Sequence, residues 1–201
     1  MATDLVTIAT TAVLSQFLGP SAKHLGEQLL ERGKRVGAKA AAMLTAVGRE
    51  PQAVEPKVLL PLVQAASLET DASLSDKWAA LLANAADPAQ RVAVQPGFAE
   101  VLRQLTPTDA RVLEAAYFSK MAPPGTTLTG RKPVKQVMEE TGFDFAVISI
   151  SVDNLLRLRL CMVPASDRAE LPNEMHLPTP SEVGTTVFGT LFLRSVTPPA
   201  S

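Results

Sequence analysis

The chain has very few of the side chains that bind metals, form disulfides or carry out redox chemistry. Its 201 residues include one cysteine, Cys161, and two histidines, His24 and His176. One cysteine cannot form an internal disulfide, so we expect a reducing compartment. Two distant histidines and one cysteine match no usual spacing of zinc ligands. We therefore expect neither a metal ion nor a cofactor.

The sequence also lacks a large net charge and a long apolar run. The formal net charge is −1, which argues against a protein that coats nucleic acid through bulk electrostatics, although a local basic patch is compatible with it. Residues 1–19 lack the basic leading region and the cleavage site of a signal peptide. Their apolar stretch is too short and too polar for a transmembrane helix. The expected location is the cytoplasm.

No sequence motif for a reaction is present. Residues 125–132, GTTLTGRK, resemble a phosphate-binding loop, but Arg131 occupies the lysine position and Pro133 stands where the loop should enter its helix. Glu139 and Glu140 are adjacent, so on a helix they point about 100° apart and cannot share one proton-transfer site. A nucleophile elbow and a helical pair of zinc-binding histidines are absent. The sequence therefore predicts a protein that is not an enzyme.

The first quarter of the chain is predicted to form two helices, over residues 4–18 and residues 20–47, separated by a Gly-Pro break. Three glycines at helical spacing form what we call the glycine stripe: Gly26, Gly33 and Gly37. Each costs about 1 kcal/mol relative to alanine inside a helix, which suggests that another helix backbone comes close. We expect a tightly packed helix with a solvated opposite face. An oligomer seam and a membrane-surface helix are the alternatives.

Two further helices, over residues 58–66 and residues 74–86, are predicted to pack as an antiparallel hairpin because a short turn joins them. Ser73 or Ser75 is the expected N-cap of the second helix. The only tryptophan of the chain lies on the apolar stripe of that helix. We expect it to be a core residue whose indole N–H needs an acceptor. The predicted core residues of this helix are Trp78, Leu81 and Leu82.

The C-terminal half begins with a helix that Thr106 is expected to cap. Residues 121–132 are predicted to be a loop, and residues 133–142 a short helix that ends at Gly142. Asp144 is the expected cap of a third helix. An extended segment, a polar loop, a second strand and a final helical turn or two follow. This is the order of elements in a winged helix.

The predicted fold class is mainly α: an N-terminal helical region plus a C-terminal winged-helix-like domain with a small β-hairpin. Residues 1–48 are assigned to the N-terminal helices and residues 49–105 to a helical hairpin region. Residues 106–194 form the winged-helix-like domain, and residues 195–201 form a tail.

In a winged helix, the third helix could read DNA. The residues that could contact DNA or a partner protein are Lys132, Lys135, Ser149, Asn154 and Arg157. The acids Glu139, Glu140 and Asp144 offset this charge, so little is left to bind phosphates. We expect a contact with protein, or a purely structural role, ahead of specific DNA binding.

Several stretches resemble the abortive infection alpha (Abi-alpha) family of bacterial and phage-encoded proteins. The most specific are WAALLANA, over residues 78–85, and LTPTDARVL, over residues 105–113. The resemblance extends over residues 17–194. It implies a role in abortive infection, in which an infected bacterium stops growing or dies before phage release, and it assigns no catalytic residue. The family tends towards a glycine before the strand that follows LRLRLC, where this chain has Arg159.

The leading hypothesis is a cytoplasmic, non-enzymatic helical protein that acts through protein contacts in anti-phage defence, with an unknown protein partner or with itself. One alternative is a winged-helix regulator that binds DNA. Another is a membrane-active effector that uses residues 4–47. No small-molecule substrate is evident from the sequence.

Overall fold

The computed structural model describes residues 21–89, 94–117, 130–164 and 180–200, with side chains from residue 26 onward. The expected helix over residues 4–18 lies outside this part. The elements follow one another in this order: α2 (Ser21–Ala46), α3 (Pro56–Leu68), α4 (Ala72–Ala86), α5 (Gly97–Arg103), α6 (Pro107–Ala116), β1 (Arg131–Pro133), α7 (Val134–Thr141), α8 (Phe145–Arg157), β2 (Cys161–Met162), β3 (Glu182–Thr185) and α9 (Val187–Ser195).

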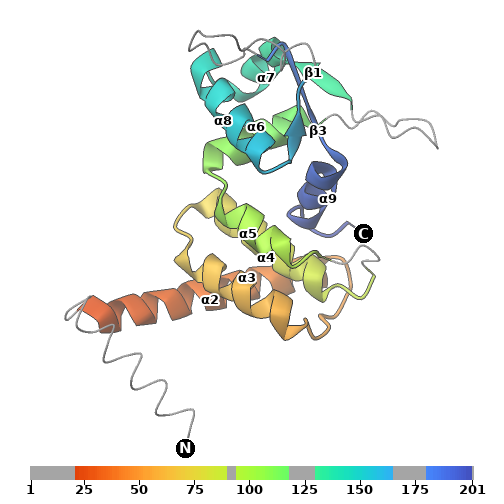
Figure 1. Ribbon diagram of the computed structural model, residues 1–201. Coiled ribbons are helices and arrows are strands. Elements are labelled where there is room, and N and C mark those ends of the chain that lie inside the picture. Colours follow the sequence, from red (N-terminus) through yellow and green to blue (C-terminus); the bar gives the residue numbers. More distant parts are fainter. Residues whose placement is uncertain (1–20, 90–93, 118–129, 165–179, 201) are drawn as a thin grey trace, which may run out of the picture.

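The helices form two groups (Figure 1). The lower group contains α2, α3, α4 and α5, and the upper group contains α6, α7 and α8 beside a small sheet. The last helix, α9, lies between the two groups, and it contacts both α4 and β3. The predicted fold class, mainly α with a small antiparallel hairpin, is confirmed.

The lower group is built around the inner face of α2. Val36, Ala40 and Leu44 are buried, and their spacing of four residues places them on one side of the helix. This side packs against α3 and α4. The predicted amphipathic helix is therefore present from Ser21 to Ala46.

The N-cap of α4 differs from the prediction. Asp71 caps the helix, because its carboxylate accepts hydrogen bonds from the backbone N–H groups of Ser73 (2.9 Å) and Leu74 (3.0 Å). The expectation of Ser73 or Ser75 was wrong. The helix begins at Ala72, two residues earlier than its apolar pattern indicated, and an aspartate stands just before that start.

Trp78 lies in the core with 1% of its surface exposed, in one contiguous cluster with Leu81 and with Phe98 of α5. Leu82 is half-buried and packs against the same cluster. The sequence predicted an acceptor for the indole N–H, but no described residue provides one. Leaving an N–H unpaired costs about 1–3 kcal/mol. That is less than the roughly 3–5 kcal/mol that a buried tryptophan typically contributes, so packing outweighs the missing bond.

The turn from α5 to α6 carries the predicted helix start. The Thr106 hydroxyl accepts a hydrogen bond from the Asp109 N–H (3.1 Å), and the Asp109 carboxylate accepts one from the Thr106 N–H (2.9 Å). This reciprocal capping box satisfies two N–H groups that the first turn leaves free. The predicted cap at Thr106 is confirmed.

The sheet has the strand order β1-β3-β2, and both pairings are antiparallel. The pairing of β2 with β3 is the predicted hairpin. β1 was not predicted, since residues 131 and 132 were assigned to a loop. β1 is only three residues long, and it is a strand because it pairs with β3. In this pairing Lys132 lies opposite Val183.

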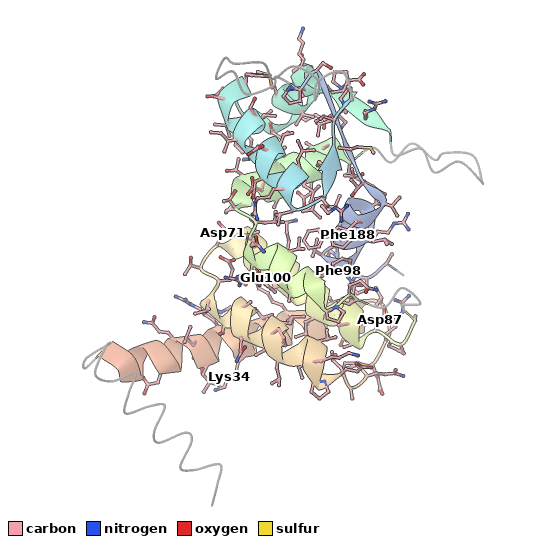
Figure 2. All side chains as sticks on the ribbon, in the orientation of Figure 1. Lys34, Asp71, Asp87, Phe98, Glu100 and Phe188 are labelled. Carbon is pink, nitrogen blue, oxygen red and sulfur yellow. The ribbon has the colours of Figure 1, made fainter. Side chains whose placement is uncertain are left out.

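The last helix returns to the lower group through aromatic contacts. The Phe98 ring of α5 lies beside Phe188 (Figure 2), edge-on with 5.4 Å between ring centroids. It also lies edge-on to Phe192, with 5.6 Å between centroids. Such edge-to-face pairs contribute about 0.5–1.5 kcal/mol beyond burial of their area. The predicted final helical turns are therefore a helix of nine residues that ties the sheet to the lower group.

Candidate functional site

The helix α8 holds the position in which a partner or DNA contact was predicted. The Asp144 carboxylate accepts a hydrogen bond from the Val147 N–H (2.9 Å), so the predicted cap is confirmed. Ile148, Val152 and Leu155 are buried and fix the helix against the core. The opposite side of α8 faces solvent, so a partner or DNA would contact that side.

Lys132, a candidate contact, is not available on the surface. It lies in β1 with 7% of its surface exposed, and its Nζ forms an ion pair with Glu140 of α7 at 2.8 Å. The hydrogen bond from Lys132 lowers the pKa of the Glu140 carboxyl, and a second bond, from Gln136, acts in the same direction. The positive charge of Lys132 therefore stabilises the contact between β1 and α7.

Asn154 and Arg157 are used to attach α8 to the turn between α5 and α6. Asn154 Nδ2 donates to a carboxylate oxygen of Asp109 at 2.8 Å. Arg157 Nη1 donates to Gln104 Oε1 at 3.0 Å, and its Nη2 donates to Asn154 Oδ1 at 2.7 Å. Asp109 is buried, so it joins the cap of α6 to the side of α8. No sequence signal predicts this contact, because 45 residues separate Asp109 from Asn154.

The two other candidate contacts differ from each other. The Ser149 hydroxyl donates to the Phe145 carbonyl at 2.9 Å, so it bonds within its own helix. Lys135 is exposed on α7, and no contact with another described residue uses its ammonium group. Of the predicted basic contacts, Lys132 is paired with an acid, whereas Lys135 has no described partner and Arg157 bonds only to the neutral amides of Asn154 and Gln104.

The exposed side of α8 carries a line of residues that we call the α8 outer stripe. It consists of Ala146, Ile150, Asp153 and Arg157, which are all exposed and follow the spacing i, i+4, i+7, i+11. Ile150 has 66% of its surface exposed, the largest fraction among the exposed large apolar side chains that the structure describes. Sequence reasoning missed it, although an isoleucine two positions from buried Ile148 must point about 160° away on a helix.

The glycine stripe lies along α2, and the structure shows little crowding there. A Cβ atom added to Gly26 or Gly37 would meet no described atom within 4 Å. At Gly33 it would meet Val63 at 3.9 Å and Ser67 at 4.0 Å, which are ordinary van der Waals distances. Close approach of a described helix backbone therefore does not explain these glycines. Leu30, on the same side of α2, is largely exposed.

The α8 helix ends in a left-handed turn. Arg159 has a φ of 61°, its N–H donates to the Leu156 carbonyl, and the Leu160 N–H donates to the Leu155 carbonyl. This pair of bonds is a Schellman motif, whose left-handed position is most often glycine. The resemblance implied a glycine here, and the turn forms with Arg159 in its place.

The remaining chemistry of the described residues is sparse. Burial raises the pKa of the Cys161 thiol to about 12, so the thiol stays protonated and is a poor nucleophile. In the part of the chain that the structure describes, no three side chains among His, Cys, Asp and Glu come together as metal ligands. His24 and His176 lie outside the residues with described side chains.

None of the described helices has the combination of length and apolar character that crossing a lipid bilayer requires.

Comparison with known protein families supplies the remaining information. The family model described as abortive infection alpha matches residues 27–194. The chain belongs to the abortive infection alpha family. The match runs from α2 to α9, so the α8 outer stripe and the aromatic contacts of α9 lie within the matched residues. No curated protein and no solved structure matches the chain.

Proposed function

We propose that this protein acts in anti-phage defence of the abortive infection type through protein–protein contact, without an enzymatic reaction. Membership of the abortive infection alpha family supports the defence role. The single thiol, which is buried and protonated, fits an action in the cytoplasm. The partner is a protein: another protein of the cell or the phage, or a second copy of this chain.

We infer that the upper group is a winged-helix-like unit. Its elements follow the order helix, strand, helix, helix, strand, strand, from α6 to β3, and its sheet has the strand order β1-β3-β2. In DNA-binding proteins of the related helix-turn-helix type, the equivalent of α8 lies in the major groove. Whether α8 can bind DNA in this way depends on the side chains of its exposed face.

The observation that carries the proposal is the exposure of Ile150 at the centre of the α8 outer stripe. A surface that binds DNA needs free cations and free hydrogen-bonding side chains. Here Lys132 pairs with Glu140, and Asn154 pairs with Asp109. The stripe also carries Asp153, which phosphates repel. An apolar side chain flanked by one acid and one base suits a protein partner better than a polyanion.

Crosslinking at the stripe tests this proposal. A photoreactive phenylalanine analogue replaces Ile150 in the full-length chain, and cells are irradiated before and after phage infection. The matched control carries the same analogue at Leu68 of α3, which is similarly exposed at 62%. We expect a protein adduct at position 150 that resists nuclease and is absent at position 68. The mass of the adduct separates a second copy from a different partner.

Two results would contradict the proposal. One is an adduct at position 150 that nuclease removes, because it would place nucleic acid on α8. The other is an equal yield of adducts at both positions, because it would show that exposure alone determines the reaction. Titration of the purified protein with DNA at increasing salt provides a second check, since a phosphate-dependent complex weakens steeply with salt.

A further inference from the structure

A cavity lies where the two groups of helices and the last helix meet. Its volume is about 470 Å³. It is lined by one residue of α4, residues at the end of α6, residues of α9 and the segment that follows it. The lining residues that determine its chemistry are Glu114, Tyr117, Leu191, Leu193, Arg194 and Pro198. Volumes of about 300–1,000 Å³ are typical of pockets for small molecules, which often lie between structural units.

Hydrogen bonds to backbone carbonyls hold the wall of this cavity in place. Asn84 of α4 is buried, and its Nδ2 donates to the carbonyls of Ser195 and Thr197, both at 2.8 Å. Further along, Arg49 donates to the Ala200 carbonyl at 2.9 Å and forms an ion pair with Asp87 at 2.6 Å. The segment after α9 is therefore fixed on α4 at several points, and the cavity has a formed wall.

The interior of the cavity is mainly apolar. Leu191, Leu193 and Pro198 supply aliphatic surface, and Tyr117 supplies an aromatic ring. Two hydroxyls of the lining are used within the chain: Ser195 donates to the Leu191 carbonyl and Thr197 to the Leu193 carbonyl. A ligand would therefore gain affinity mostly by burying apolar surface.

The charged groups of the lining are not equivalent. Glu114 forms an ion pair with Lys77, so its negative charge is compensated. Arg194 is exposed, and no described residue pairs with its guanidinium. The backbone carbonyl of Arg194 accepts a hydrogen bond from Asn84 at 3.4 Å. The uncompensated charge at the cavity is positive, and a guanidinium binds carboxylate or other oxyanions through two parallel hydrogen bonds.

We propose that this cavity is a binding site for a small apolar molecule that carries one anionic group, such as a medium-chain carboxylate. The apolar body packs between Leu191, Leu193 and Pro198, and the anionic group pairs with Arg194. Such a ligand contacts α4, α6 and α9 together, so it links the lower group to the upper group. This site is separate from the α8 outer stripe and does not depend on the function proposed for that stripe.

The test is isothermal titration calorimetry of the full-length protein with decanoate and, separately, with the decyltrimethylammonium cation. Two variants address the site. Arg194→Gln removes the charge, and Ala200→Phe places a ring at the exposed edge of the cavity. The matched control is Arg35→Gln, which removes another exposed arginine, on α2. Thermal melting verifies that each variant folds as the wild type does.

We expect decanoate to bind the wild type and the Arg35→Gln protein equally, and to bind Arg194→Gln about tenfold more weakly, which is the size of effect that loss of one charge-assisted contact produces. Ala200→Phe should abolish binding, and the cation should not bind. The proposal is overturned if decanoate does not bind the wild type. It is also overturned if decanoate binds both site variants as tightly as the wild type, or if the cation binds better than decanoate.

Discussion

Two regions of this protein use glycine in opposite ways. Along α2, the glycine stripe is uncrowded: an added Cβ at Gly26 or Gly37 meets no described atom within 4 Å, and one at Gly33 meets α3 only at ordinary van der Waals distances. At the junction of β3 and α9, an added Cβ at Gly189 would lie 2.0 Å from the Leu160 carbonyl oxygen. The regular spacing on α2 suggested crowding, whereas the lone glycine of α9 suggested nothing. Spacing within one helix does not reveal which backbone lies opposite it.

The turn after α8 explains why Gly189 is crowded. Leu160, whose carbonyl restricts Gly189, directly follows Arg159, the non-glycine residue with a left-handed backbone. The Leu160 carbonyl also accepts a hydrogen bond from the Thr186 N–H at 2.9 Å. The same few atoms therefore close the turn, anchor the start of α9 and exclude a side chain at position 189. We call this region, from Leu155 to Cys161 with Thr186 and Gly189, the α8–α9 junction.

The largest expected effect concerns access to the α8–α9 junction. The Cys161 thiol should react with an alkylating reagent at least about a thousandfold more slowly in the folded protein than in urea, because labelling requires the chain to open. The measurement is mass spectrometry of the labelled fraction over time at pH 8. Labelling of the native protein within a tenfold margin of the unfolded rate would show that the junction is open.

The same thiol predicts a pH dependence. Its pKa is about 12 in the folded protein against an ordinary value of 9.0. Between these values the unfolded chain releases the proton while the folded chain keeps it, so the free energy of unfolding should fall as pH rises from 9 to 12. The Cys161→Ala protein should show a smaller fall over this window. Equal pH slopes in urea unfolding of the two proteins would contradict this assignment.

The next effect is steric. Gly189→Ala should lower the free energy of unfolding by about 3 kcal/mol, the upper part of the range for overpacking, because the methyl group meets a backbone carbonyl that also holds Thr186. Urea unfolding measures this change. Gly97→Ala, at a helical glycine with open surroundings, is the matched control and should not destabilise the protein. A loss below 0.5 kcal/mol at position 189 would mean that the junction relaxes easily.

On α2, where the glycine stripe is uncrowded, a larger side chain should increase stability. Gly37→Ala should raise the free energy of unfolding by about 1 kcal/mol, since alanine favours the helix and its methyl group meets no described atom. Urea unfolding and sedimentation are measured together. Destabilisation, or a change of oligomeric state, would show that the glycine stripe faces a backbone after all, as the oligomer-seam hypothesis requires.

The smallest expected effect is at the left-handed turn. Arg159→Gly should stabilise the protein by slightly less than 1 kcal/mol, because glycine adopts this backbone without steric cost but loses more freedom on folding. Arg159→Ala, which keeps the Cβ atom, should bring no gain. If both variants have the same free energy of unfolding in urea, the left-handed backbone at position 159 does not lower the stability of the protein.

Local signals in the sequence predicted most of the helices. Thr106, Asp144 and Gly142 each act on backbone groups within four residues, so their roles can be recognised from the sequence. The strand β1 could not be predicted, because its three residues gain their conformation from β3, about fifty positions away. The cap of α4 was missed for a local reason, because the apolar pattern starts at Leu74, two residues after the helix begins.

The candidate site was predicted less well, because its side chains pair with residues that the sequence does not place beside them. Asn154 and Arg157 looked like free polar side chains on a helix, yet Asn154 binds Asp109 of α6 and Arg157 binds Gln104 of the α5–α6 turn. Lys132 looked like a surface cation and is paired with Glu140. What the sequence does place correctly is the axis of α8, from its buried stripe. The exposure of Ile150 follows from that axis.

Phage plating on cells that express the protein tests the role of Ile150 most directly. Cells carry the wild type, Ile150→Asp or the control Leu68→Asp, which adds the same charge at a similarly exposed leucine on α3, and immunoblots verify equal protein levels. We predict that the wild type and Leu68→Asp reduce plaque formation equally, and that Ile150→Asp restores it to the level of cells without the protein. Full protection by Ile150→Asp would contradict a defence contact made through α8.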